Sequence, residues 1–306
     1  KPGFARYGLM CSENGIVIDD GVFVRLAEDH FLCHSTSGGA ARIFQWLEEW
    51  LQCEWPDLQV VVSNQTSQWA NVTVSGPKAR ELMNLLESDI DFDREAFPHM
   101  QFRTGHIEGV PSRVLRASFT GEVTYEISVP ARFGLSLWER VYEIGQPLGI
   151  TPYGLESLMV LRTEKGYLHI GLDTDGTTTP LDLGWGVPIS KKVDDFIGAR
   201  SLQRPNDQRS DRLQFVGLQS VENEKPLPLG GHIISQANPK IPIDTQGYCT
   251  SACYSPTLKR WIGLGMVRSG RERMDESVFI FSNGKTVAAK ILSPTHFDQK
   301  GERLNG

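Results

Sequence analysis

One stretch of thirteen residues constrains the fold of this chain more than any other part of it. It reads Ser118-Phe-Thr-Gly-Glu-Val-Thr-Tyr-Glu-Ile-Ser-Val-Pro130. The Thr120-Gly121-Glu122 triplet is typical of a turn, and the residues that follow alternate between apolar and polar. The pattern predicts a strand with two distinct faces. The apolar face carries Val123, Tyr125 and Ile127, and the polar face carries Glu122, Thr124, Glu126 and Ser128.

The carboxylate of Glu126 is the chemically distinctive group on this strand. An acid on a strand usually faces water, and the spacing alone favours that interpretation. A second acidic site follows the apolar run Ile16-Val17-Ile18, where Asp19 and Asp20 are adjacent. Acids on two strands, each among apolar neighbours, could instead share one pocket, and this is the interpretation that a functional site requires.

Length and composition indicate an ordinary globular protein. The chain has 306 residues, enough for two or three domains, with 40% hydrophobic and 22% charged residues. A net charge of −6 argues against nucleic acid or an anionic membrane surface as the main partner. We find no membrane-spanning run and no signal peptide, and the five scattered cysteines favour free thiols, so a cytoplasmic location is expected.

The succession of elements predicts an α+β middle unit and an all-β C-terminal unit. Residues 56–145 alternate between strands and helices in a way that favours a ferredoxin-like unit, including a strand at 58–63 and a helix at 77–86 capped by Ser75. Residues 203–212 form a polar linker. After it, from 212 to 306, short strands separated by Pro and Gly turns predict a small barrel or sandwich.

No metal site and no nucleophilic triad is expected from the local sequence. The run from Asp173 to Gly176 resembles the start of a calcium loop, but the twelfth position is Gly184 where a bidentate Glu is required. The seven histidines show no metal-ligand spacing. Trp46, Trp50 and Trp55 could form a binding platform, although core packing beside a helix is the favoured interpretation.

Four blocks together resemble the glycine-cleavage T-protein (aminomethyltransferase) superfamily, and within it the α subunits of heterotetrameric sarcosine oxidases. The first block is residues 118–130. The others are Tyr7-Gly-Leu-Met with Asp19-Asp20 downstream, Gly171-Leu-Asp-Thr-Asp-Gly-Thr-Thr-Thr-Pro-Leu-Asp-Leu-Gly184, and Asp195-Phe-Ile-Gly-Ala-Arg-Ser-Leu202. Their order and spacing cover nearly the whole chain.

The resemblance implies a multi-domain, aminomethyltransferase-like fold. The folate-binding domain would be discontinuous, built from residues 1–55 and 146–204, around a middle unit at 56–145 and before a C-terminal barrel at 212–306. The chain begins Lys1-Pro-Gly-Phe and reaches the Tyr7 block at once. The resemblance therefore also implies a C-terminal portion of a longer protein, with the N-terminal part of the first domain missing.

The resemblance gives the candidate residues distinct roles in binding tetrahydrofolate. Glu126 would accept two parallel hydrogen bonds from the amino group and ring N–H of the pterin. Tyr7 and Phe119 would contact the cofactor. Arg162, in Leu161-Arg-Thr-Glu164, would line the folate cavity and pair with an acidic group, and an interior salt bridge is the alternative.

Asp20 aligns with the catalytic aspartate of the family. A carboxylate near the folate nitrogens can accept a proton from the attacking ammonium and stabilise a cationic iminium species. Asp19 would point to the opposite side of the strand, because adjacent strand residues face apart.

Two departures from the T-protein pattern bear on the one-carbon donor. Phe119 and Val24 stand where that pattern carries tyrosines. Losing those hydroxyls argues against a lipoyl-bound donor and favours a small imine that arrives from a flavin site.

The resulting hypothesis is a one-carbon-transfer module that captures the imine from sarcosine oxidation as 5,10-methylenetetrahydrofolate. Its cofactor would be tetrahydrofolate, with FAD, FMN and NAD bound only by the missing part and by partner subunits. The β, γ and δ subunits would be its partners. A free-standing aminomethyltransferase or folate-dependent demethylase is one alternative, and a non-catalytic folate-binding or structural domain is another.

Overall fold

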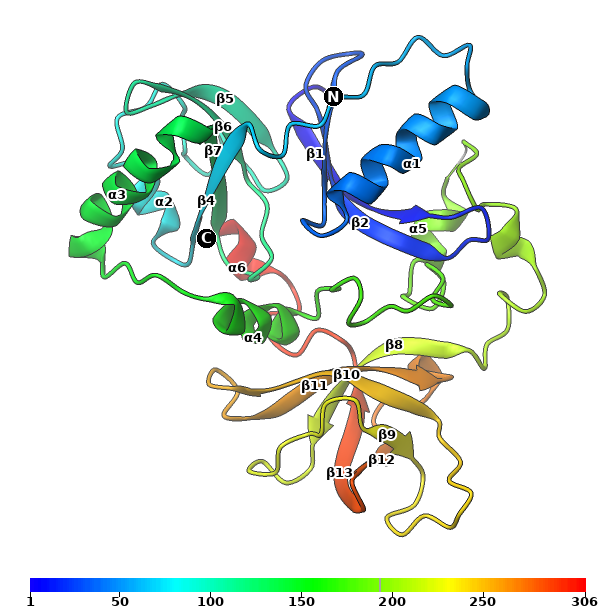
Figure 1. Ribbon diagram of the computed structural model, residues 1–306. Coiled ribbons are helices and arrows are strands. Elements are labelled where there is room, and N and C mark those ends of the chain that lie inside the picture. Colours follow the sequence, from blue (N-terminus) through cyan, green and yellow to red (C-terminus); the bar gives the residue numbers. More distant parts are fainter. Residues whose placement is uncertain (193) are drawn as a thin grey trace. The chain divides into compact units, whose positions relative to one another are not determined.

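The computed structural model describes residues 1–192 and 194–306, and the chain has the predicted α+β composition (Figure 1). Its residues group into two compact units. The first comprises Lys1–Gly8, Asp19–Tyr153 and Gly301–Gly306, and the second comprises Leu9–Ile18 and Gly154–Lys300. This division is coarser than the three domains expected from the sequence, whose boundaries stay predictions.

A three-stranded sheet with the order β1-β2-β3 is followed by a long helix. The elements are β1 (Phe4–Cys11), β2 (Val17–Arg25), β3 (Phe31–Ser35) and α1 (Ala40–Cys53). Strands β2 and β3 pair antiparallel, with Gly21 opposite Ser35. A Cβ at Gly21 would lie 1.8 Å from the His34 carbonyl oxygen, so only glycine allows the two backbones to approach this closely.

The middle of the chain forms a four-stranded antiparallel sheet with the order β4-β7-β6-β5. Its elements are β4 (Trp69–Ser75), α2 (Ala79–Met83), β5 (Phe102–Ile107), β6 (Val110–Leu115), β7 (Thr124–Pro130) and α3 (Gly134–Gly145). Both helices pack on one face, over a core that includes Tyr125, Ile127 and Val129. The two layers match a ferredoxin-like unit. The chain order differs, because three strands separate α2 from α3.

The alternation predicted for the signature stretch is confirmed. Tyr125 and Ile127 are fully buried in the core under the helices, whereas Glu126 and Ser128 alternate with them and are partly buried. The strand β7 begins at Thr124, after the predicted turn. Side-chain periodicity alone was therefore sufficient to orient this strand.

Two local predictions in the middle unit are wrong. Residues 58–63 form no strand, and Val61 is 95% exposed, because no neighbouring strand supplies the ladder that would bury it. Ser75 does not cap α2, which starts at Ala79 without a side-chain capping hydrogen bond. The Ser75 hydroxyl instead bonds the hydroxyls of Thr120 and Thr124. A capping pattern cannot distinguish these two uses of a serine.

The two sheets of the first unit pack against each other on the faces that lack α2 and α3. Ala5 of β1 and Val24 of β2 share a cluster with Phe102 of β5 and Leu115 of β6, and all four are buried. The face of β7 that carries Glu126 is therefore the face directed toward the three-stranded sheet. This packing is what brings the Tyr7 and Glu126 blocks together within one unit.

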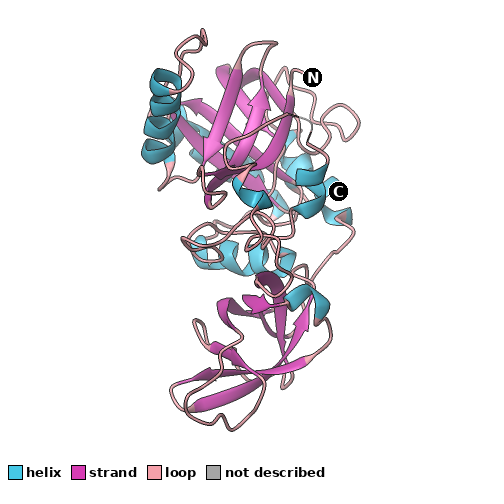
Figure 2. Ribbon diagram, turned by 90° about the vertical axis from the view of Figure 1, so that its right-hand side faces the viewer, coloured by secondary structure: helices cyan, strands magenta, loops and turns pink. Residues whose placement is uncertain are grey.

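The second unit contains a closed six-stranded barrel with the order β10-β11-β8-β13-β12-β9, which Figure 2 shows as curved strands around one interior. Its strands are β8 (Leu213–Ser220), β9 (His232–Ile234), β10 (Gly247–Ser255), β11 (Arg260–Arg268), β12 (Ser277–Ser282) and β13 (Lys285–Leu292). The interior is apolar, with Leu218, Ile233, Ile280 and Ile291 fully buried. The predicted C-terminal barrel is confirmed.

Three further α-helices are assigned in the described residues; two precede the barrel strands in the sequence and the third follows them. They are α4 (Leu155–Lys165), α5 (Gly186–Ser190) and α6 (Glu302–Asn305). Among the described residues, no helix has both the length and the apolar character that crossing a bilayer requires.

Candidate functional site

Glu126 lies in the middle of β7, flanked by Thr73 on β4 and Leu115 on β6. Its carboxylate is only partly exposed, and burial raises its pKa from 4.5 to about 7. No N–H or O–H group of the described residues donates a hydrogen bond to it, and no cation pairs with it. A desolvated acceptor without a protein donor is costly to keep, which is typical of a site that a ligand completes.

Tyr7 and Asp20 lie on the two strands that face this surface. Side chains two or four apart share a face of a strand, so Tyr7 is on the face of Ala5, and Asp20 is on the face of Val24. The Tyr7 hydroxyl donates a hydrogen bond of 2.6 Å to Asp20 Oδ2. The predicted catalytic and cofactor-binding residues of the first block are thus in direct contact, and their strands pack against the sheet of Glu126.

Asp19 faces the other way and holds the strand in place. Its side chain is fully buried, and Oδ2 accepts a hydrogen bond of 3.1 Å from Thr36 Oγ1. Oδ1 accepts one of 2.9 Å from the Asp20 backbone N–H. Arg42, on the first turn of α1, has its Nη2 3.8 Å from Asp19 Oδ2. Asp19 therefore joins β2 to the start of α1 and fixes the backbone that presents Asp20.

A dense set of hydroxyl contacts fixes the turn before β7. Ser118 Oγ accepts hydrogen bonds from the Gly121 N–H (3.0 Å) and from Thr124 Oγ1 (3.1 Å). Ser75 shares bonds with Thr120 (2.7 Å) and Thr124 (2.8 Å). Gly121 adopts φ = 83°, the left-handed conformation that glycine accommodates without strain. This network sets the position of Phe119, which lies inside the turn and is partly buried.

Arg162 belongs to the second unit and occupies an interior salt bridge there. Its side chain is fully buried, with Nη1 2.6 Å from Asp173 Oδ2 and 3.0 Å from the Tyr167 carbonyl oxygen. Nη2 donates to Ser251 Oγ on β10. The salt bridge considered as an alternative in the sequence is therefore present. A contact between Arg162 and folate stays a prediction.

Three further residues surround the Glu126 face without having been predicted. Burial, and to a smaller degree the negative charge of Glu126, raises the pKa of Tyr153. Arg113 on β6 is opposite Ser128, two residues from Glu126 along β7, and its guanidinium lies 3.8 Å from the Trp69 ring centroid. Burial and the charge of Arg113 lower the pKa of His34. Strand register places Arg113, whereas Tyr153 and His34 come from elements outside the four-stranded sheet, and a single sequence specifies neither arrangement.

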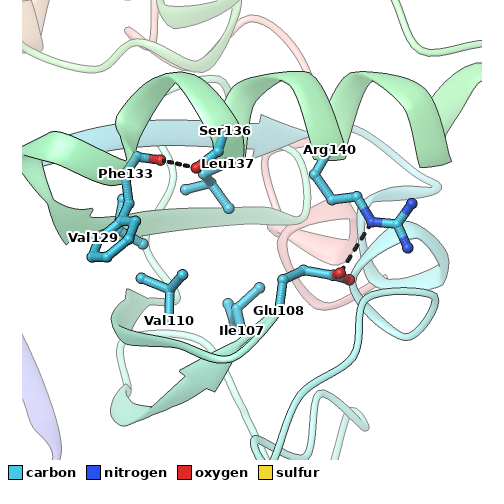
Figure 3. A pocket seen from close by; sticks show the side chains of 8 residues that line it. All are labelled: Ile107, Glu108, Val110, Val129, Phe133, Ser136, Leu137 and Arg140. Atoms are coloured by element: carbon cyan, nitrogen blue, oxygen red, sulfur yellow. Dashed lines mark hydrogen bonds and ion pairs between the residues drawn. The ribbon is translucent and has the colours of Figure 1, made fainter.

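A separate hollow of about 270 Å³ lies on the helix-covered side of the same sheet (Figure 3). Its wall is mostly apolar, with Val110, Val129 and Leu137 directed toward it. An ion pair of 3.1 Å between Arg140 and Glu108 lies at one end. Val129 alternates with Ser128, so this hollow is on the opposite face from Glu126 and is not part of the candidate site. Within residues 1–192 and 194–306, no His, Cys, Asp or Glu group is arranged to hold a metal ion.

The fold is that of an aminomethyltransferase. The crystal structure of the glycine cleavage system aminomethyltransferase T from Bartonella henselae superposes with a TM-score of 0.80. The match covers 98% of this chain and 77% of that one, at 23% sequence identity, and supports the fold alone.

Family models identify the chain more specifically. The GCVT N-terminal domain matches residues 1–193, and the glycine cleavage T-protein C-terminal barrel domain matches residues 214–298. The chain therefore belongs to the glycine cleavage T-protein family, as the four sequence blocks predicted.

Curated relatives fall into two groups. The sarcosine oxidase subunit alpha of Corynebacterium sp. (strain P-1) is 42% identical over 100% of this chain, and that of Rhizobium meliloti is 38% identical over 99%. The aminomethyltransferase of Desulfitobacterium hafniense (strain DSM 10664 / DCB-2) is 27% identical over 97% of this chain and 77% of its own length. This chain spans about a third of the alpha subunits, 32% and 31% of their lengths.

The buried salt bridge predicts that Arg162→Ala destabilises the second unit strongly. Asp173 would lose its guanidinium partner while remaining fully buried, so we expect a loss of roughly 3–5 kcal/mol in the free energy of unfolding, measured by urea denaturation. The control is Arg209→Ala, whose ion pair with Asp211 is exposed and screened by water, so its loss should change stability little. Equal losses in the two variants would show that the Arg162 pair is not a structural anchor.

The raised pKa of Glu126 predicts that Glu126→Gln stabilises the free protein at high pH. The folded carboxyl holds its proton up to about pH 7, whereas the unfolded one releases it near 4.5, so parent stability falls as pH rises between these values. Glutamine avoids this loss. We measure the free energy of unfolding of variant and parent in urea at pH 4 and at pH 8. The difference in favour of the variant should be larger at pH 8 than at pH 4 by roughly 2–3 kcal/mol. The exposed Glu139→Gln is the control, and a pH-independent difference between Glu126→Gln and the parent would contradict the assignment.

Proposed function

We propose that this chain is the tetrahydrofolate-binding, one-carbon-transfer module of a sarcosine-oxidase-like enzyme. Identity of 42% and 38% to two sarcosine oxidase alpha subunits, over at least 99% of the chain, supports this placement. The module would capture the imine from amine oxidation as 5,10-methylenetetrahydrofolate. FAD, FMN and NAD would be bound by the rest of the alpha subunit and by the β, γ and δ partner subunits.

The observation that carries the proposal is the partly buried Glu126 carboxylate without a protein donor. A reduced pterin presents an amino group and a ring N–H side by side, and an ionised carboxylate can accept both. Hydrogen bonds to a charged acceptor contribute about 1.5–3 kcal/mol each, and desolvation at this position strengthens them. The residue therefore suits the pterin edge in the two bonds that its ionised form can accept and in its lack of a protein donor.

The Tyr7–Asp20 pair would supply the proton chemistry. When bound, tetrahydrofolate supplies the nitrogens that accept the one-carbon unit. The Tyr7 hydroxyl, 2.6 Å from Asp20 Oδ2, holds the carboxylate in one orientation. Asp20 would accept the proton released by an attacking nitrogen and stabilise positive charge on the incoming imine. Phe119 would contact the cofactor through its ring, and Arg162 is retained as a cavity-lining candidate through its place in the family motif.

A free-standing aminomethyltransferase is the second candidate. Relatives with that name match this chain over 75–77% of their own lengths, so their whole fold is nearly represented here. Two residues weigh against it. Val24 is fully buried in the apolar cluster between the sheets, and Phe119 carries no hydroxyl, so neither supplies the polar contacts that the tyrosines of the T-protein pattern offer. A small imine needs fewer such contacts than a carrier-bound donor.

The proposal predicts separate effects for the two acids in calorimetric titration with tetrahydrofolate. Glu126→Gln should weaken binding by at least roughly tenfold, about 1.4 kcal/mol, because an amide cannot accept two parallel bonds as an anion does. Asp20→Asn should change affinity much less. In the complete oxidase, the same Asp20 variant should oxidise the amine normally and lose folate-dependent methylene formation.

The paired variants also define the results that would contradict the proposal. A folded parent without affinity for tetrahydrofolate, or a Glu126→Gln variant that binds as well as the parent, would exclude Glu126 as the pterin acceptor. Unchanged methylene formation in Asp20→Asn would leave a folate-binding domain without a catalytic role for Asp20.

A further inference from the structure

The last six residues of the chain, Gly301–Gly306, belong to the first unit although the preceding residues belong to the second. We call this segment the C-terminal strap. It contains the short helix α6, drawn in red in Figure 1 near the four-stranded sheet. The strap has no counterpart in the sequence predictions, which treated it as the end of the barrel domain.

Two arginines bind the backbone carbonyls of the strap: Arg80 on α2 and Arg116 directly after β6. Arg116 is 1% exposed, and its Nη2 donates a bond of 2.7 Å to the Leu304 carbonyl oxygen. Arg80 Nη2 donates one of 3.1 Å to the Asn305 carbonyl oxygen. Within the described part of the chain, Nε of both arginines and Nη1 of Arg116 are buried without an acceptor. Two such cations depend strongly on the few acceptors they have, and the strap provides them.

A third anchor connects the strap to the turn before β7. Arg303 Nη1 forms an ion pair with Glu122 Oε1. The Glu122 side chain is only 14% exposed, so this pair is less screened by water than a typical surface pair. Gly306 lies against the next residue of the turn, since a Cβ there would be 2.8 Å from Val123 Cγ2. The strap therefore contacts the end of the turn and the first buried residue after it.

Glu122 is a member of the hydroxyl network that sets the turn. Its backbone N–H donates to Thr120 Oγ1 (3.3 Å), and its carbonyl accepts from Thr124 Oγ1 (3.0 Å). The side chain of Glu122 is held by Arg303, and its backbone bonds both hydroxyls, so the ion pair and the hydroxyl network share one residue. These hydroxyls are also bonded to Ser75 and Ser118, and Ser118 and Thr120 are the sequence neighbours of Phe119.

We propose that the strap is a positioning device for the folate site, with Arg303 and Glu122 as its positioning residues. This inference rests on the proposed function, because the turn matters to activity only if Phe119 and Glu126 contact folate. Neither Arg303 nor Glu122 touches the ligand in this scheme. Their ion pair restricts the movement of the turn, and the turn fixes the position of Phe119. Because β7 begins directly after the turn, the turn also fixes the position of Glu126 along the sheet.

Charge reversal tests the proposal in two measurements on the same variants. Arg303→Glu should speed amide hydrogen exchange at residues 118–124 in the ligand-free chain, and it should weaken tetrahydrofolate binding roughly fivefold or more. Glu122→Arg should do the same. The double variant Arg303→Glu with Glu122→Arg restores the pair with its charges exchanged, and it should recover both values to within about twofold of the parent.

The control variant is Arg140→Glu, which breaks the pair with Glu108 on the helix-covered side of the sheet. It should alter neither exchange at residues 118–124 nor folate affinity. Unchanged exchange in Arg303→Glu would overturn the strap as a positioning device, whether or not the parent binds folate. Faster exchange with unchanged affinity would also overturn it, because the turn would then move without affecting the site. A parent that binds no folate would contradict the proposed function separately.

Discussion

The candidate site of the first unit depends on one desolvated carboxylate that has no hydrogen-bond donor among the described residues. Glu126 sits on the face of its sheet that packs toward a second sheet, where burial raises its pKa to about 7. Protein interiors rarely keep such a group without a donor, because the desolvation cost is not offset. A folate-binding role gives this cost a reason, since the ligand would bring the donors. Stability of the empty protein would be reduced in exchange for affinity, as at many functional sites.

Two fully buried acids, Asp19 and Asp173, show how a carboxylate behaves when its role is structural. Asp19 is fully buried but accepts bonds from Thr36 and from the Asp20 backbone. Asp173 is equally buried and pairs with Arg162 at 2.6 Å. Each has its donors within a few ångströms in the protein itself. Glu126 differs from both in having none among the described residues, and this difference distinguishes a candidate binding group from an internal anchor.

The sequence predicted most of the fold and only part of the site. The strict alternation of β7 placed Glu126 on the opposite face of the strand from Tyr125 and Ile127. The Pro and Gly turns after residue 212 predicted the barrel. It failed at residues 58–63, where strand propensity was high but no partner strand was available. The sequence also did not predict that Arg113 and Tyr153 lie near Glu126. Strand pairing brings Arg113 there, and the path of the chain after α3 brings Tyr153 there. Long-range pairing is a property of the folded chain, and a local pattern does not encode it.

Proton release on folate binding tests the role of Glu126 most directly. With a pKa of about 7, the carboxyl of the free protein is mostly protonated at pH 6, whereas it must ionise to accept both pterin donors. Calorimetry in buffers of different ionisation enthalpy counts the protons exchanged. We expect nearly one proton released per tetrahydrofolate at pH 6, almost none at pH 8.5, and no such difference in Glu126→Gln. The same proton count in the parent and the variant would show that Glu126 does not bind the pterin as an ionised acceptor.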